Sequence, residues 1–237
     1  MKHCIKGFDQ MSLVDWDGMV ATTLYLSGCN FRCPYCHNSE LVVSPDQFES
    51  IPIDEILSYV GEHTDFLDGV VVTGGEPCAH KTVAELLTRL KDAGLSTKLD
   101  TNGSFPAVLE QVIEDEIVDY VAMDVKAPLD FESYRRSAGI ADRKTLDRVR
   151  DSVDLLMEAR VDYEFRMTVV PVLHKASDLM LIGDRLRGAA RFVLQPYVPR
   201  NTIDPAFEDE EPYDLERLQE FRDMLAPMFD ECVIRSE

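Results

Sequence analysis

Three cysteines that lie close together have the most specific chemistry in this sequence. Cys29, Cys33 and Cys36 follow the spacing C-x3-C-x2-C. Thiolates at this spacing can converge on one soft metal centre, although structural zinc and ordinary iron–sulfur clusters take four protein ligands. His37 directly follows Cys36 and is a candidate fourth ligand for zinc, but adjacent residues rarely reach one ion in tetrahedral geometry. If no fourth protein ligand arrives, a 4Fe-4S cluster would keep one iron open for a substrate or a cofactor.

Two segments rich in small and polar residues each follow an apolar stretch. Gly74 and Gly75 let the backbone approach a ligand without obstruction by side chains, and Glu76 adds a carboxylate. Asp100 and Asn102 follow the next apolar stretch and can hydrogen-bond a polar ligand. A structural alternative stays open for both segments, because each is also compatible with a simple turn.

Charged residues alternate with apolar ones further along the chain. Asp124 and Lys126 flank a single valine, so both side chains point to the same side of a strand. Arg166 lies between two apolar residues and is expected to be buried, where it would suit a ligand carboxylate or an incoming peptide. A charged pair that faces an interior needs partners. A bound amino acid would supply them, and a structural salt bridge between Asp124 and Lys126 is the alternative.

Strands that alternate with helices must position these residues. Runs of β-branched and aromatic residues predict strands at 22–26, 69–73, 96–101, 119–125, 163–171 and 191–195. Apolar residues at helical spacing predict helices at 83–90, 146–156 and 215–225, the first with a capping box of Thr82 and Glu85. This order predicts an α/β fold with a parallel sheet, either doubly wound or a barrel. The candidate residues fall at the carboxyl ends of the strands, so we expect them to face one cleft.

Composition limits the class of protein. The chain has 237 residues, is 45% hydrophobic, and carries 44 acidic against 24 basic side chains, for a net charge of −20. This charge disfavours binding to nucleic acid. The sequence has no apolar run of about 18 residues and no apolar signal-peptide core, so we expect a cytoplasmic protein without a membrane segment. Cys4, Cys78 and Cys232 are scattered, and we expect them to be ordinary thiols.

The cysteine spacing, with the aromatic Tyr35 before the last cysteine, resembles the signature of the radical S-adenosylmethionine superfamily. The Gly-Gly-Glu-Pro segment at 74–77 extends the match. The resemblance implies a partial (β/α)6 barrel of the TIM type, with a 4Fe-4S cluster on Cys29, Cys33 and Cys36 whose open iron binds S-adenosylmethionine. We expect a single domain over 1–237, with an N-terminal ribbon at 1–20, the barrel at 21–200, and an acidic loop with a C-terminal helix and strand at 201–237.

A closer resemblance is to the activases of glycyl-radical enzymes. Residues 7–38, which end in Cys-His-Asn, and the segment 123–129 are similar to an activating protein of the anaerobic ribonucleoside-triphosphate reductase. That reductase is the partner the resemblance implies, with a reductant such as flavodoxin or ferredoxin. The glycine-rich segment is then expected at the amino group of S-adenosylmethionine, and the residues around Cys36 near its adenine. The residues expected at this cofactor are Tyr35, His37, Gly74, Gly75, Glu76, Asp100, Asn102, Asp124, Lys126 and Arg166.

Two other functions stay open from the sequence. An enzyme of the same superfamily that acts on a small molecule, such as a 7-carboxy-7-deazaguanine synthase, shares the three cysteines and a Gly-Gly-Glu segment. The Cys-His-Asn continuation and the Asp-Val-Lys-Ala-Pro segment favour the activase. A zinc-stabilised binding protein with Cys29, Cys33, Cys36 and His37 as ligands is the third candidate, and the metal content of anaerobically purified protein would separate it.

Overall fold

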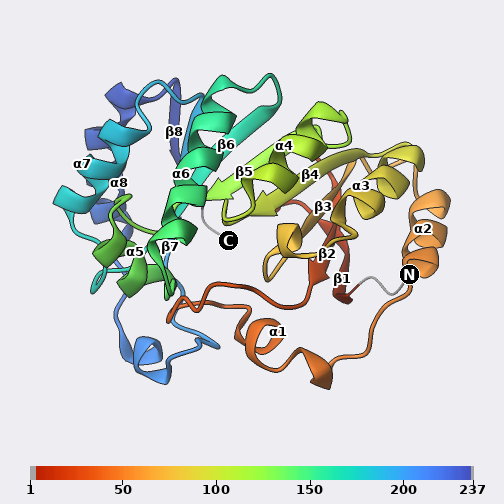
Figure 1. Ribbon diagram of the computed structural model, residues 1–237, viewed down its shortest axis with the longest axis horizontal. Coiled ribbons are helices and arrows are strands. Elements are labelled where there is room, and N and C mark those ends of the chain that lie inside the picture. The colour runs from red at the N-terminus through yellow and green to blue at the C-terminus, as the bar shows by residue number, and fades with distance from the viewer. Residues whose placement is uncertain (1–3, 236–237) are drawn as a thin grey trace.

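One continuous sheet of eight strands organises residues 4–235, which are those described in this computed structural model (Figure 1). The strands lie side by side in chain order; β1 pairs antiparallel with β2, and every later neighbouring pair is parallel. The strands are β1 (Ile5–Ser12), β2 (Ala21–Leu26), β3 (Gly69–Gly74), β4 (Ser96–Thr101), β5 (Tyr120–Asp124), β6 (Asp162–Val169), β7 (Arg191–Pro196) and β8 (Glu231–Ile234).

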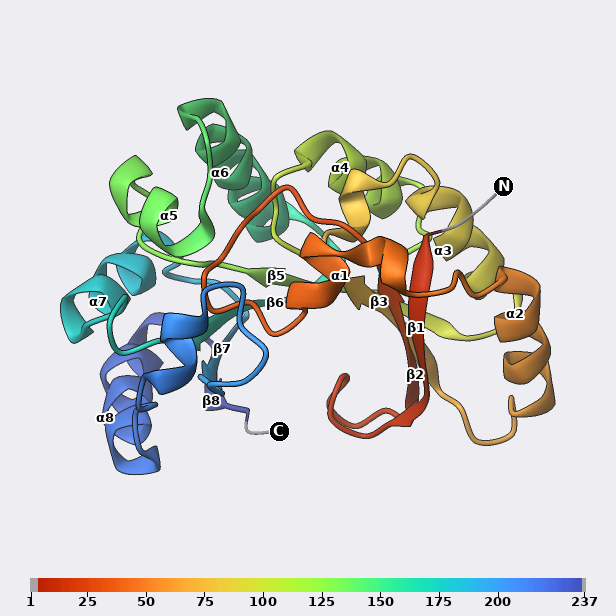
Figure 2. The same cartoon turned by 90° about the horizontal axis from the view of Figure 1, so that it is seen from below.

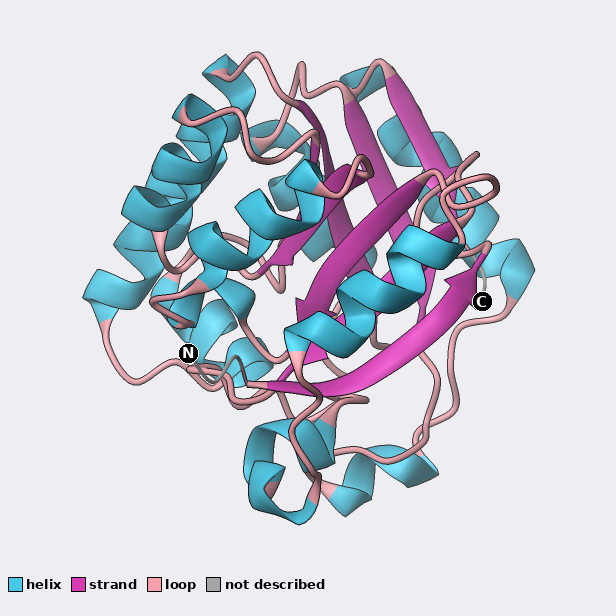
Figure 3. Ribbon diagram, turned by 90° about the vertical axis from the view of Figure 1, so that its right-hand side faces the viewer, coloured by secondary structure: helices cyan, strands magenta, loops and turns pink. Residues whose placement is uncertain are grey.

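The longer helices connect successive strands and lie on the outside of the curved sheet (Figures 1 and 3). Within residues 4–235, no helix combines the length and the apolar character that crossing a membrane requires. The helices are α1 (Ser39–Val43), α2 (Ile53–Glu62), α3 (Val83–Asp92), α4 (Pro106–Glu114), α5 (Phe131–Ala138), α6 (Arg143–Glu158), α7 (Ala176–Arg185) and α8 (Leu215–Leu225).

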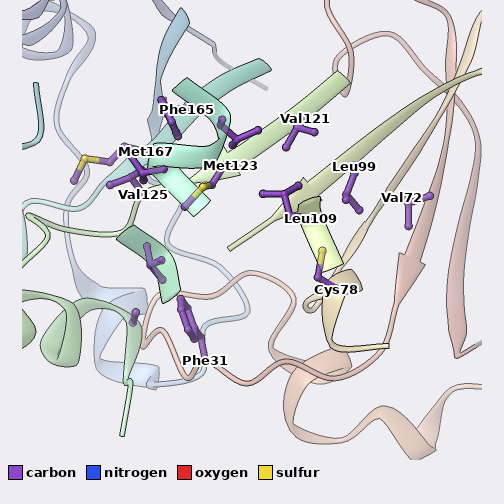
Figure 4. Close-up of a cluster of buried hydrophobic side chains, with 14 of the residues drawn as sticks. Phe31, Val72, Cys78, Leu99, Leu109, Val121, Met123, Val125, Phe165 and Met167 are labelled. Carbon is purple, nitrogen blue, oxygen red and sulfur yellow. The ribbon is translucent and has the colours of Figure 1, made fainter. Parts of the chain in front are cut away.

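The central strands present an apolar face to the helices and a polar face to the interior. Figure 4 shows Val72, Leu99 and Val121, from β3, β4 and β5, with Leu109 of α4 in the same buried cluster. Side chains alternate across a strand, so the other face of β4 carries the fully buried Lys98. The concave side of the sheet therefore holds charged groups, and the hydrophobic core lies between the sheet and its outer helices.

The predicted α/β fold is confirmed, and the six predicted strands correspond to β2–β7. The strand predicted to reach Pro171 ends at Val169, because the N–H of Val170 donates to Nδ1 of His174 (3.0 Å). The helix predicted at 83–90 runs to Asp92, but its capping box is wrong. Among the described residues, the Thr82 side chain caps no N–H, since its backbone (φ −101°, ψ 8°) is outside the extended region that capping requires.

The sheet curves into a partial barrel that does not close. β1 and β8 are its two edges, and Figure 2 shows the open side between β8 and the β1–β2 hairpin. The six strands β2–β7 form the partial barrel that the resemblance implied. The C-terminal strand, expected only as part of the tail, joins the sheet as β8, paired with β7.

Candidate active site

The loop that carries the three cysteines leaves the carboxyl end of β2. Gly28 begins this loop with φ of +79°, a backbone conformation that favours glycine. The N–H of Cys36 donates to the carbonyl of Cys33 (3.1 Å), which turns the end of the loop back on itself. Cys29, Cys33 and Cys36 consequently line one cavity of about 310 Å³.

The three thiols line one cavity without forming a site for a single metal ion among the described residues. Among residues 4–235, no group of three or more His, Cys, Asp or Glu side chains is placed to hold one metal ion, which weighs against the zinc site with His37. A 4Fe-4S cluster binds thiolates at separate irons, so its ligands stand further apart than those of zinc. Burial raises the pKa of Cys29 to about 11 and that of Cys33 to about 12, so metal binding must release protons from both thiols.

Four charged side chains form one chain of ion pairs along the cavity. Oδ1 of Asp124 accepts from Nε of Arg166 (2.9 Å), and its Oδ2 accepts from Nζ of Lys126 (3.0 Å). Nη1 of Arg166 also donates to Oδ2 of Asp100 (3.0 Å). Burial alone would raise the pKa of Asp124, but the charges of Arg166 and Lys126 lower it to about 2. The cavity wall therefore combines carboxylates and cations within hydrogen-bond reach of one another.

Two buried polar atoms at this cavity lack a hydrogen-bond partner within the described part of the chain: Oδ1 of Asp100 and the hydroxyl of Tyr35. Nζ of Lys98 is 3.6 Å from Oδ1 of Asp100, beyond hydrogen-bond distance. Buried polar groups are nearly always hydrogen-bonded, so the cavity fits a ligand that brings a donor to Asp100. A ligand with hydroxyl or ammonium donors and a carboxylate for Lys126 or Arg166 satisfies the site.

The glycines after β3 permit a close contact between two backbones. A Cβ on Gly75 would lie 1.9 Å from the carbonyl oxygen of Gly28, and one on Gly74 would lie 2.3 Å from that of Leu26. Gly74 and Gly75 both line the cavity. Because these glycines have no side chains, the turn after β3 can pack directly against the start of the cysteine loop. The same lack of side chains leaves space at the cavity.

Glu76, one of the residues expected at the cofactor, is not among those that line the cavity. It is fully buried, and its carboxylate accepts from the N–H of Asn102 (2.6 Å), the hydroxyl of Thr101 (2.7 Å) and the N–H of Cys78 (3.0 Å). Burial raises the pKa of Glu76 to about 7 in spite of these hydrogen bonds. These three hydrogen bonds connect the turn after β3, where Glu76 and Cys78 lie, to Thr101 and Asn102 at the end of β4.

Asn102 lines the cavity, but protein neighbours engage its side chain. Its Oδ1 accepts from the N–H (2.9 Å) and the hydroxyl (2.5 Å) of Ser104. Its Nδ2 donates to Oδ1 of Asn30 (3.1 Å) and to Sγ of Cys29 (3.7 Å). Asn102 therefore helps to position the first cysteine, and Asp100 retains the acceptor that can meet a ligand.

Aromatic rings enclose the cavity on the side of the third cysteine. Tyr35 and His37 both line the cavity. The ring of Tyr35 meets those of His174 and Tyr197 edge-on, at centroid distances of 6.3 and 6.4 Å. His37 stacks on Tyr197 at 6.2 Å. The two residues next to Cys36 thus share one aromatic wall, which can accept the flat face of a ligand.

Several residues at the cavity or directly behind it lie outside the set predicted from the sequence. Lys98 does not line the cavity but is fully buried beside Asp100, and its Nζ donates to the carbonyl of Asp15, which does line it. Lys98 and Asp100 flank one apolar residue, the same pattern that identified Asp124 and Lys126, so this pair was detectable. Asp15 comes from the β1–β2 hairpin, and no sequence pattern places it here. The other additional lining residues include Tyr25, Thr168 and Gln195.

The chain matches known proteins over the residues that carry most of this site. The model of the Radical SAM superfamily matches residues 24–179. A Methanocaldococcus jannaschii protein, whose name assigns it to the glycyl-radical enzyme activating enzymes, is 29% identical to this chain. The match covers 100% of this chain and 97% of that protein. It is also 29% identical to the pyruvate formate-lyase 1-activating enzyme of Escherichia coli K12, over 70% of this chain and 68% of that enzyme.

Solved structures share the fold at lower identity. SuiB of Streptococcus suis, bound to S-adenosylmethionine, has a TM-score of 0.69 and 14% identity over 89% of this chain and 48% of SuiB. QueE from Escherichia coli has a TM-score of 0.53 and 18% identity over 98% of this chain and 93% of QueE. At these identities the likeness shows the fold alone.

Proposed function

Because this chain belongs to the Radical SAM superfamily, whose enzymes use a 4Fe-4S cluster and S-adenosylmethionine, we propose that it is the activase of a glycyl-radical enzyme. The observation that carries this proposal is a similarity over the whole chain to a protein named as such an activating enzyme. In this superfamily, the bound cluster supplies the electron that splits the sulfonium bond and yields a 5′-deoxyadenosyl radical. The chain's own task is then to bind, orient and shield the reactants.

We assign the residues to the two cofactors by their chemistry. Cys29, Cys33 and Cys36 would hold the cluster, since they line one cavity. Lys126 and Arg166 are the cations for the carboxylate of S-adenosylmethionine. The free oxygen of Asp100 is the acceptor for a ribose hydroxyl.

The remaining wall supports these contacts. Gly74 and Gly75 provide the backbone beside the amino group, and Asn102 and Glu76 hold the loops in place. Tyr35 and His37 form the aromatic wall for the adenine. The open side of the partial barrel admits the glycine-bearing segment of the partner (Figure 2).

The proposed partner is the anaerobic ribonucleoside-triphosphate reductase. Its support is the resemblance of residues 7–38 and 123–129 to an activating protein of that reductase. The test mixes the reduced, cluster-loaded protein with S-adenosylmethionine and the reductase without oxygen. Electron paramagnetic resonance should then show a glycyl doublet, and a Cys33→Ala variant should give none. Formation of 5′-deoxyadenosine without a glycyl radical on the reductase or on pyruvate formate-lyase would overturn the activase and favour a small-molecule substrate.

A further inference from the structure

A cluster of exposed cations lies beside the cysteine loop of this acidic chain. Residues 130–150 carry six basic and four acidic side chains, whereas the whole chain carries 24 basic and 44 acidic ones. This segment includes α5, the turn after it and the first half of α6. The exposed cations of the segment, together with one from the cysteine loop, define the basic patch: Arg32, Arg135, Arg136, Arg143, Lys144 and Arg148.

The basic patch is attached directly to the cysteine loop. The N–H of Arg32 donates to the carbonyl of Ala138, the last residue of α5 (2.9 Å). A Cβ on Gly139, where φ is +63°, would lie 2.6 Å from the carbonyl oxygen of Arg32, so glycine is required for this contact. The rings of Phe31 and Tyr134 meet edge-on at 6.5 Å. Figures 1 and 2 show α5 beside this loop, so a protein that docks on the patch lies next to the segment between the first two cysteines.

The basic patch holds an excess of positive charge. Arg135 pairs with Glu132 (2.9 Å), and the other five cations of the patch form no ion pair with the described residues. Arg143 lies over the ring of Phe131, 4.8 Å from its centroid, which fixes it between α5 and α6. The six cations outnumber the acidic residues beside them, Asp130, Glu132 and Asp142, so the patch keeps a net positive charge that attracts an anionic partner.

The other side of the cysteine loop has the opposite charge. Residues 204–211 contain five acidic side chains and no basic one. The N–H of Asp204 donates to the carbonyl of Pro34 (3.0 Å), and the carbonyl of Phe207 accepts from the hydroxyl of Tyr197 (2.5 Å). The loop therefore has a positive flank at α5 and α6 and a negative flank at 204–211, and an acidic protein is directed to the positive one.

We propose that the basic patch is the docking surface for an acidic one-electron carrier protein with a reduced flavin or iron–sulfur centre. The proposal rests on the proposed function, which consumes one electron for each S-adenosylmethionine that is cleaved. One electron leaves the carrier, which is oxidised, and enters the cluster, which is reduced; no atom is transferred. Charge on the patch acts on the rate of encounter between the two proteins.

The test reverses two unpaired charges in Arg136→Glu/Lys144→Glu. Reduced flavodoxin, an acidic flavin protein, serves as the carrier, and reduced methyl viologen serves as a small reductant that needs no docking surface. The rate of 5′-deoxyadenosine formation with flavodoxin at low salt should fall about tenfold, and the rate with methyl viologen should stay unchanged. Added salt should slow the flavodoxin reaction of the parent protein much more than that of the variant.

A matched control makes the same change in net charge elsewhere. Arg187→Glu/Arg217→Glu alters two exposed arginines on the α7–α8 side, each paired only within its own turn, and should keep the parent rate with flavodoxin. Equal flavodoxin rates for the two double variants would overturn the docking surface. A glycyl radical on the reductase, when it is added to these variants with methyl viologen as the reductant, would show that the proposed function stands independently of this result.

Discussion

At the scale of single residues, Lys126 and Arg166 share one carboxylate, that of Asp124. Lys126→Met removes one cation but leaves Asp124 paired with Arg166, so the fold and the cluster should remain. The affinity for S-adenosylmethionine should fall by roughly 10- to 100-fold, the effect of losing a charge-assisted hydrogen bond. Calorimetry on the cluster-loaded protein measures this change, and Lys91→Met on the surface is the control. Unchanged affinity would place Lys126 in a purely structural ion pair.

His174 predicts how stability depends on pH. Its Nδ1 accepts from the N–H of Val170 (3.0 Å), so its Nε2 donates to the carbonyl of Lys126 (2.9 Å), and burial lowers its pKa to about 4. As the pH falls below 6.5, the unfolded chain takes up a proton that the folded chain does not. The contribution of His174 to the free energy of unfolding should therefore decrease between pH 6.5 and pH 4, by about 3 kcal/mol. The raised pKa of Glu76 acts in the opposite direction over part of this range, so the effect of His174 is read as a difference between two proteins.

Denaturant unfolding across this pH range measures the effect. His174→Asn keeps an acceptor for Val170 but cannot titrate, so the parent should lose stability relative to this variant as the pH falls from 6.5 to 4. Identical pH profiles for the two proteins would contradict a buried neutral His174.

At the scale of elements, the turn after β3 and the start of the cysteine loop approach each other through glycine. Gly75→Ala would place a Cβ 1.9 Å from a backbone oxygen that cannot move as a side chain could. The free energy of unfolding of the metal-free protein should fall by about 3 kcal/mol. Gly61→Ala on α2 is the control, since no described atom outside its own helix lies within 4 Å of the added Cβ, and stability should hold or rise slightly. A Gly75→Ala protein as stable as the parent would contradict this contact.

At the scale of the whole molecule, ion pairs cross the open side of the partial barrel. Asp17, in the β1–β2 hairpin, pairs with Arg235 after β8 (2.7 Å) and with Arg191 at the start of β7 (2.5 Å). Asp17→Asn should lower the free energy of unfolding by about 1 kcal/mol at low salt and by less at high salt, because its side chain is 40% exposed and thus screened. Asp184→Asn, which breaks only a surface pair with Arg187, should have no measurable effect. A loss that does not diminish with salt would contradict this explanation.

Local patterns determined much of this protein from the sequence by itself. Runs of β-branched residues located β2–β7, because strand formation depends on side chains within a few positions of one another. The same two-residue period put Asp124 and Lys126 on one side of the sheet. The spacing of Cys29, Cys33 and Cys36 in one short loop gave three thiols that line one cavity.

Only the tertiary structure decided which groups are free to meet a ligand. Glu76 and Asn102 stand in segments expected at the cofactor, yet each is engaged by protein partners, whereas Asp100 retains an acceptor. A hydrogen bond between segments distant in sequence depends on which donors the packed strands bring within reach, and no local pattern encodes that competition. The closure of the sheet is likewise a long-range property, since whether β8 pairs with β7 alone or also with β1 depends on the curvature summed over all eight strands.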